Sequence, residues 1–284
     1  MTLNRVTVIG LGLMGGSLAL ALRRAGLAAH IVGCGREERL RQAREMCVID
    51  SGSVDAGESV RGSDFVFFCT PVETSIKLLK QVAPRLKPGA LVTDVGSTKQ
   101  AFAAAARETF GSAANERVLP GHPLAGREVS GLAHASADLY KGCRWVLTPL
   151  AGEMLPVHRC LISALETIGA HIIFSTPEEH DHTLAYTSHL PQLLSTALSL
   201  TLRKTFGSGN PALQAHAGGL RTMLRLAESD PVMWEQIADS NQANIAEALE
   251  NIEAELRELR GCLTSPEFRT KFELAREFTK GLKS

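Results

Sequence analysis

The stretch that decides the fold is residues 6–16, which read VTVIGLGLMGG. Its first four residues are all β-branched and predict a short buried strand. The glycines that follow have the spacing G-x-G-x-x-G, and a helical pattern begins directly after them. In this setting Gly10 permits a tight turn, Gly12 lets the backbone approach a pyrophosphate, and Gly15 lets the helix pack closely on the strand. The predicted cofactor contacts in this loop are Gly10, Gly12, Leu13, Met14 and Gly15.

Apolar runs and amphipathic segments alternate through the first half of the chain, which favours a parallel sheet with helices. Residues 64–69 (DFVFFC) form a continuous apolar run, typical of a strand that helices cover on both faces. The sequence therefore predicts the α/β class and a Rossmann-type doubly wound parallel sheet. Further strands are expected at residues 30–34, 90–95, 117–119, 145–147 and 171–174, the last two as late edge strands.

The pattern changes near residue 177, beyond which the sequence shows helical periodicity and no convincing strand. Apolar residues at helical spacing between Ile245 and Leu259 indicate a face that packs in a bundle or a dimer interface. We expect a dinucleotide-binding Rossmann domain over residues 1–176 and an all-helical domain over residues 177–284.

The composition excludes several classes of partner. The 284 residues carry 30 basic and 30 acidic side chains, so no net charge favours nucleic acid or an anionic membrane. No apolar run approaches the roughly 20 residues that span a bilayer, and the N-terminus does not resemble a signal peptide. Six cysteines without metal-like spacing indicate reduced thiols and no metal site. We expect a soluble cytoplasmic protein that acts on a small molecule.

The end of the second predicted strand bears on the choice of cofactor. NAD-selective sites usually place an acidic residue here to bind the ribose hydroxyls, but this strand continues into Gly35 and Arg36, with no acid before Glu37. Arg36 is suited to pairing with a 2′-phosphate, so we expect NADP rather than NAD. The alternative is that Arg36 is solvated and the protein uses both. Other strand ends add the predicted cofactor contacts Cys69, Thr70, Pro71 and Gly96.

Four further side chains are candidates for chemistry. His122 lies in GHPLAG (121–126), where glycine and proline on both sides predict a constrained ring beside the strand ends. His189 in SHLP and Arg225 in RLAESDP come from the helical half, and each alone is more often a packing or salt-bridged residue. Ser97 in DVGSTK offers a hydroxyl near the cofactor.

Taken together, these segments resemble the prephenate/arogenate (cyclohexadienyl) dehydrogenase family of tyrosine biosynthesis. The combination of GHPLAG, SHLP and R-x-A-x-S-x-P-x-x-W is far more specific than the dinucleotide loop. The matching segments follow in order over nearly the whole chain: GLGLMGGSLA, CTP, DVGSTK, GHPLAG, WVLTP, HDHTLAYTSHLPQ and RLAESDPVMWEQI.

The resemblance implies an oxidative decarboxylation. Hydride leaves the ring carbon that bears the hydroxyl group and passes to the nicotinamide, while the ring carboxylate departs as carbon dioxide. The product is 4-hydroxyphenylpyruvate from prephenate or tyrosine from arogenate. His122 matches the catalytic histidine that accepts the hydroxyl proton and must be neutral to do so. Ser97 matches the serine that hydrogen-bonds near it.

The resemblance also implies substrate contacts from the helical domain. Arg225 matches the arginine that holds a substrate carboxylate, and His189 matches a histidine near the substrate side chain. Glu128 and Trp234 match positions that line or gate the pocket. The family's helical domains bind substrate and interlock as a homodimer. The chain's length leaves no room for a regulatory domain, so tyrosine inhibition is expected to act at the active site.

Other readings remain open at this point. A β-hydroxyacid dehydrogenase resembles this organisation but uses a lysine early in its helical domain, and residues 180–199 contain none; a cyclic imino acid reductase is a weaker variant. A non-catalytic NADP-sensing module is the alternative from another class. Prephenate and arogenate are not distinguished either. Arogenate carries an ammonium group that favours a nearby carboxylate, for which Asp181 and Glu128 are candidates. The compact length of the chain also resembles arogenate-using members.

Overall fold

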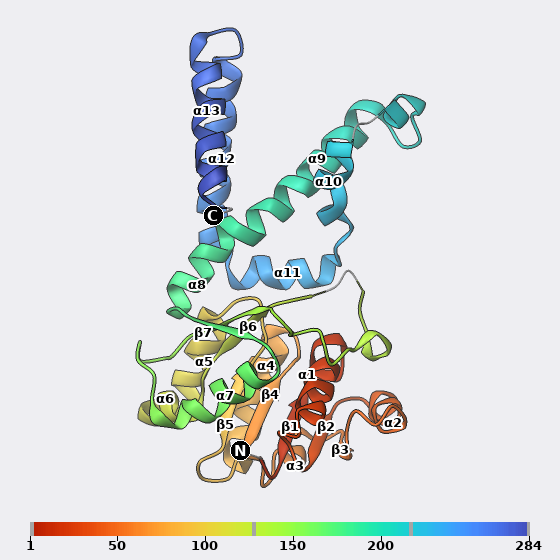
Figure 1. Ribbon diagram of the computed structural model, residues 1–284, viewed down its shortest axis with the longest axis vertical. Helices are drawn as coiled ribbons and strands as arrows, with labels where there is room; N and C mark the ends of the chain where they lie inside the picture. Colours follow the sequence, from red (N-terminus) through yellow and green to blue (C-terminus); the bar gives the residue numbers. More distant parts are fainter. Residues whose placement is uncertain (1–2, 127–128, 216–217, 283–284) are drawn as a thin grey trace. The chain divides into compact units, whose positions relative to one another are not determined.

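The computed structural model describes residues 3–126, 129–215 and 218–282. The chain forms two compact units, which are described separately: Met1–Thr183 with Glu228–Asn241, and Leu184–Ala227 with Gln242–Ser284. Figure 1 labels most of the helices and strands of both.

The first unit contains a five-stranded parallel sheet in the order β3-β2-β1-β4-β5. The chain moves outward from β1 to β3 and then crosses to the other side of β1. This reversal between β1 and β4 is the topological switch point at which doubly wound sheets bind ligands. The predicted Rossmann-type fold is therefore confirmed. The strands are β1 (Val6–Ile9), β2 (Ile31–Cys34), β3 (Ser51–Ser53), β4 (Phe65–Phe68) and β5 (Leu91–Asp94).

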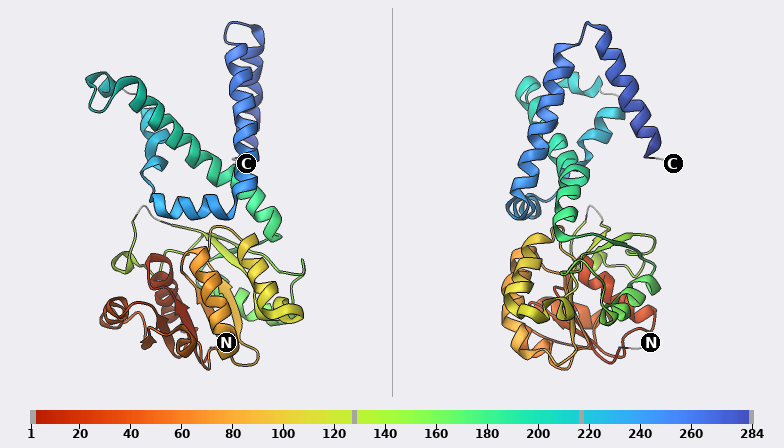
Figure 2. Two further views of the ribbon diagram at one scale, coloured as in Figure 1. Left: turned by 180° about the vertical axis from the view of Figure 1, so that it is seen from behind. Right: turned by 90° about the vertical axis from the view of Figure 1, so that its left-hand side faces the viewer.

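Helices cover both faces of this sheet, as the view in Figure 2 (right) shows. Successive β4 side chains enter different cores, with Phe65 and Phe67 in one and Val66 and Phe68 in the other. This alternation explains why the whole strand is apolar. One core holds side chains of α1 (Leu13–Arg24), α2 (Glu37–Glu45) and α7 (Arg159–Thr167); the other holds those of α3 (Ala56–Ser59), α4 (Val72–Val82), α5 (Gln100–Phe110) and α6 (Ala114–Arg117).

A second sheet, of three strands in the order β6-β7-β8, was not expected from the sequence. The predicted strand at residues 117–119 is wrong, since Val118 makes only a single bridge to Val92. The extended segment begins later, where β6 pairs antiparallel with β7 and places Pro123 opposite Trp145. The predicted late edge strands belong to this second sheet instead of extending the main one: the first pairs with β6, and the second pairs parallel with the first. These strands are β6 (Gly121–Leu124), β7 (Arg144–Leu147) and β8 (His171–Phe174).

Two helices complete the first unit, α8 (Pro177–Leu184, up to Thr183) and α11 (Pro231–Ser240). The Asp230 side chain caps α11 by accepting a hydrogen bond from the Val232 N–H at 3.0 Å. The end of α11 is fastened to the unit by two bonds: the Thr98 hydroxyl to the Ser240 hydroxyl at 2.8 Å, and Asn241 Nδ2 to the Asp181 carbonyl at 2.8 Å.

The described residues of the second unit form helices joined by turns, with no strand among them. A π-helical turn (Ala185–His189) leads into α9, and Gln192 donates to the Leu226 carbonyl at 2.6 Å. Of the predicted apolar stripe on α12, Ile245 is buried, whereas Leu256 is 53% exposed. Within the described residues no helix is long and apolar enough to cross a membrane. The longer helices are α9 (Leu190–Phe206), α10 (Gly218–Leu224), α12 (Gln242–Gly261) and α13 (Pro266–Gly281).

Candidate active site

The dinucleotide loop is shaped by positions that tolerate no side chain. Gly10 has φ +95°, and a Cβ there would lie 2.5 Å from the Cys69 carbonyl oxygen. A Cβ on Gly15 would lie 2.0 Å from the Gly10 oxygen, so α1 packs against its own turn. A Cβ on Gly12 would meet no described atom within 4 Å. The loop is therefore packed tightly against other protein atoms at Gly10 and Gly15, whereas Gly12 has open space beside it.

The start of α1 is suited to an anion. Gly12 is its N-cap and provides no side-chain hydrogen bond, and the first turn carries no acidic residue. The N–H groups of this turn and the positive end of the helix dipole face the position where the pyrophosphate of a dinucleotide binds in this fold. These residues therefore fit the pyrophosphate of a dinucleotide.

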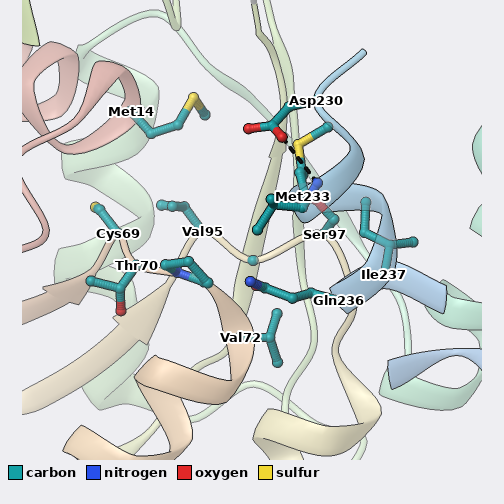
Figure 3. Close-up of a pocket in the computed structure, with 13 residues that line it drawn as sticks. Met14, Cys69, Thr70, Val72, Val95, Ser97, Asp230, Met233, Gln236 and Ile237 are labelled. Atoms are coloured by element: carbon teal, nitrogen blue, oxygen red, sulfur yellow. Dashed lines mark hydrogen bonds between the residues drawn. The ribbon is translucent and has the colours of Figure 1, made fainter. Parts of the chain in front are cut away.

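A cavity of about 270 Å³ lies at the carboxyl ends of the strands (Figure 3). Its walls come from α1, from the segments after β4 and β5, and from α11, whose Gln236 side chain extends toward it (Figure 3). The structure brings six of the predicted residues together here, namely Met14, Cys69, Thr70, Pro71, Gly96 and Ser97. From α11 the sequence predicted only Trp234 as a pocket residue, and none of the residues that line this cavity. The lining residues from that segment are Asp230, Val232, Met233, Gln236 and Ile237.

Most of this cavity wall is apolar. Burial raises the pKa of the Cys69 thiol far above its ordinary value, and the nearby Asp94 carboxylate adds to the rise. Cys69 therefore stays protonated and acts as a wall rather than as a nucleophile.

A buried ion pair joins the loop after β5 to strand β6. Lys99 is completely buried, contacts the Asp94 carboxylate and donates to the Gly121 carbonyl at 2.7 Å. Asp94 also accepts from the N–H groups of Gly96, at 2.9 Å, and Gly121, at 3.1 Å. Burial lowers the pKa of Lys99, and the Asp94 carboxylate opposes this effect. The pair fixes the segment that carries Ser97 relative to His122, which follows Gly121.

His122 is the first residue of a hydrogen-bonded line of side chains. Its Nδ1 lies 2.9 Å from His180 Nε2, and His180 Nδ1 lies 2.7 Å from Asp181 Oδ1. The side chains of His180 and Asp181 are completely buried. The sequence does not predict this arrangement, because His180 and Asp181 are polar residues at the start of a helical pattern and nothing near them in the sequence marks them as partners of His122.

Asp181 also binds the start of α5. Its Oδ1 accepts from the Lys99 N–H at 2.7 Å, and its Oδ2 accepts from the Gln100 N–H at 2.9 Å. The expectation that Asp181 could recognise a substrate ammonium group is therefore wrong, because the buried carboxylate is engaged by three protein donors. Glu128, the other candidate, lies outside the described residues.

The other predicted site residues that the structure describes are not among those that line this cavity. Gly35 and the exposed Arg36 lead from β2 into α2, where Arg36 is the N-cap. Trp234 is half-buried on α11, between the lining residues Met233 and Gln236. His189 is buried and Arg225 is exposed, and both belong to the second unit.

Family models match nearly the whole chain. Residues 18–174 match the model described as prephenate dehydrogenase, nucleotide-binding domain. Residues 176–280 match the model described as prephenate dehydrogenase, dimerization domain.

Comparison with individual proteins points to the same family. A prephenate dehydrogenase of Lactococcus lactis is 32% identical over 259 residues, covering 90% of this chain and 70% of the relative. Prephenate dehydrogenase from A. aeolicus, solved with hydroxyphenyl propionate and NAD+, superposes with a TM-score of 0.86 at 30% identity, covering 100% of this chain and 97% of that one. Synechocystis arogenate dehydrogenase gives a TM-score of 0.84 at 28% identity, covering 98% and 99%.

The resemblance that the motifs predicted is thus confirmed by both domain models and by the fold. The chain belongs to the prephenate dehydrogenase family.

Proposed function

We propose that this protein is a nicotinamide-dinucleotide-dependent dehydrogenase that oxidatively decarboxylates prephenate, arogenate or both, giving 4-hydroxyphenylpyruvate or tyrosine. The observation that carries the proposal is the fixed relation between His122 and the cofactor cavity. The Lys99–Asp94 pair binds Gly121, next to His122, and Asp94 also binds Gly96, which lines the cavity. Family membership and the named relatives support the same reaction.

The residues of the first unit have distinct roles in this proposal. When bound, the nicotinamide supplies the acceptor for the hydride. His122 accepts the proton of the substrate hydroxyl group as the carbon that bears it becomes carbonyl-like. Ser97 donates a hydrogen bond near the same oxygen. The apolar wall around Cys69 limits access of water to the transfer.

Substrate binding is assigned to side chains of the second unit. Arg225 holds a carboxylate with its planar guanidinium group, and His189 contacts the substrate side chain. Support for both comes from their match to the family motifs. Glu128 and Trp234 are proposed to line or gate the pocket on the same basis.

The variant His122→Asn tests the catalytic role. Loss of the base is expected to lower kcat by about 10²- to 10⁴-fold with either substrate, the usual contribution of general acid–base catalysis. The dissociation constant of the dinucleotide, measured by fluorescence titration, stays within about twofold because the cavity walls are intact. His171→Asn is the matched control, since His171 is exposed on β8 of the same sheet. Wild-type turnover in His122→Asn removes it as the base.

We further propose NADP as the preferred cofactor. Support comes from the end of β2, where Gly35 and the exposed Arg36 stand in place of the acidic residue of NAD-selective sites. Arg36→Ala is expected to raise the KM for NADP+ about tenfold or more and to change the KM for NAD+ little, because only the former carries the 2′-phosphate. Arg41→Ala removes the same charge further along α2 and serves as control. Equal effects on both cofactors, or a wild-type preference for NAD+, contradict this assignment.

The domain and assembly assignments are also proposed. A nucleotide-binding domain over residues 1–176 and a substrate-binding and dimerisation domain over 177–284 agree with the ranges of the two family models. The description of the second model as a dimerization domain supports a homodimer. A cytoplasmic location is supported by the cysteines, all six of which are free thiols.

A further inference from the structure

The line of side chains behind His122 leads from β6 to a buried carboxylate. The rings of His122 and His180 have centroids 5.1 Å apart and an interplanar angle of 67°. Their nitrogens are 2.9 Å apart, and the second ring continues to Asp181 at 2.7 Å. Both steps are ordinary hydrogen-bond distances.

The chemistry of these groups decides where the protons lie. An ionised carboxylate can only accept, so His180 must carry its proton on Nδ1 to bind Asp181. In a neutral His180 ring Nε2 is then an acceptor, and His122 must donate to it from Nδ1. The second nitrogen of His122, Nε2, is therefore the unprotonated one.

Asp181 is held in place independently of the histidines. Its two carboxylate oxygens accept from the backbone N–H groups of Lys99 and Gln100 at the start of α5. Its own carbonyl accepts from Asn241 at 2.8 Å. The Lys99 ammonium group, which also feels the Asp181 charge, is paired with Asp94. Asp181 thus provides a fixed negative charge at the end of the line.

We propose that His180 and Asp181 are positioning residues that hold His122 as the Nδ1–H tautomer and present Nε2 as the proton acceptor. Together they favour the imidazolium that His122 becomes on taking the substrate proton, because Nδ1–H remains bonded toward the Asp181 carboxylate. This inference rests on the proposed role of His122 as the base.

The tautomer can be observed without turnover. Two-bond ¹H–¹⁵N correlation spectra of histidine-labelled protein with dinucleotide bound identify His122 by the signal lost in His122→Asn. At neutral pH we expect a protonated Nδ1 and an unprotonated Nε2. In His180→Phe, which fills the space but accepts no hydrogen bond, this preference is lost, whereas His171→Phe retains it. A proton on Nε2 in the wild type, or an unchanged His122 signal in His180→Phe, overturns the proposal.

Kinetics supply the second measurement. His180→Phe is expected to lower kcat about 10²-fold while the dissociation constant of the dinucleotide is unchanged. His180→Gln keeps an amide oxygen that can accept from His122 Nδ1, so it should recover about tenfold of that loss. If His180→Phe does not fold, His180→Gln carries the test alone, with an expected loss of about tenfold relative to wild type. Wild-type kcat in the variant that folds contradicts the proposal.

The two proposals fail in different ways. Absence of wild-type turnover with both prephenate and arogenate contradicts the proposed function and leaves the spectra decisive for the tautomer. Turnover by the wild type and by His180→Phe at equal rates contradicts only the positioning role.

Discussion

At the scale of single residues, two glycines in the same loop serve different purposes. Gly15 lies where a Cβ would collide with the Gly10 carbonyl oxygen at 2.0 Å, so its lack of a side chain is a requirement of folding. Gly12 lies where a Cβ would touch no described protein atom within 4 Å. Its lack of a side chain is explained by the close approach of the pyrophosphate.

The pair Gly12→Ala and Gly15→Ala separates these roles. Gly15→Ala is expected to destabilise the protein by about 1–3 kcal/mol, the usual cost of forcing extra volume into a packed site. Gly12→Ala should leave the melting temperature nearly unchanged and weaken dinucleotide binding about tenfold or more, because only the ligand meets the new methyl group. Thermal unfolding and fluorescence titration measure the two effects. Wild-type affinity in Gly12→Ala places the pyrophosphate elsewhere.

At the scale of elements, the position of α11 in the sequence does not predict the unit to which it belongs. It follows a long helical stretch of the second unit, yet it belongs to the compact unit of the sheet. Met233, Gln236 and Ile237 on this helix line the cavity, and its end is bonded to Thr98 and Asp181. The start of α11 is therefore a place where helix stability and cofactor binding are linked.

Two substitutions at the N-cap of α11 test that link. Asp230→Ala removes the acceptor for the Val232 N–H and should cost about 1 kcal/mol of stability, with a higher dissociation constant for the dinucleotide. Asp230→Asn retains a capping oxygen and should remain close to wild type in both. Urea unfolding and fluorescence titration give the two values. Equal losses of affinity in both variants indicate that the charge of Asp230, rather than the cap, matters.

Local sequence predicted the elements whose burial is uniform and missed those that depend on distant partners. β1 and β4 were recognisable because strands covered on both faces are continuously apolar. β6 was missed because GHPL reads as a loop; it is an edge strand, where Pro123 is tolerated.

The same limit applies to the site. The G-x-G-x-x-G spacing makes the backbone roles of Gly10 and Gly15 predictable from the sequence. By contrast, nothing local to His180 indicates that it bonds to a ring 58 positions away. The role of Asp181 was misjudged for the same reason, since its partners Lys99 and Gln100 lie in another element.

At the scale of the whole molecule, α13 carries apolar side chains that its own unit does not cover. Leu274 and Phe278 are 62% and 70% exposed. Exposed apolar groups in this density are typical of an interaction surface. The match of this region to a dimerization domain makes a second copy of the chain the expected partner.

Sedimentation velocity tests this assignment. The wild type is expected to sediment as a dimer, and the double variant Leu274→Glu, Phe278→Glu as a monomer, because four buried charges at a symmetric interface lack partners. Val54→Glu places a charge on an exposed apolar position of the first unit, 64% exposed, and should remain dimeric. If the double variant stays dimeric, the assignment of the dimer interface to α13 is contradicted.

The central claim, that this chain couples hydride transfer to loss of a carboxylate, is tested most directly by product stoichiometry. The wild-type protein is incubated with prephenate or arogenate and NADP+ or NAD+, and reduced nicotinamide, carbon dioxide and the aromatic product are measured together. We predict equal amounts of all three with at least one substrate, with His122→Asn forming almost none. Reduced nicotinamide without carbon dioxide, or no reduction with any of the four combinations, contradicts the account.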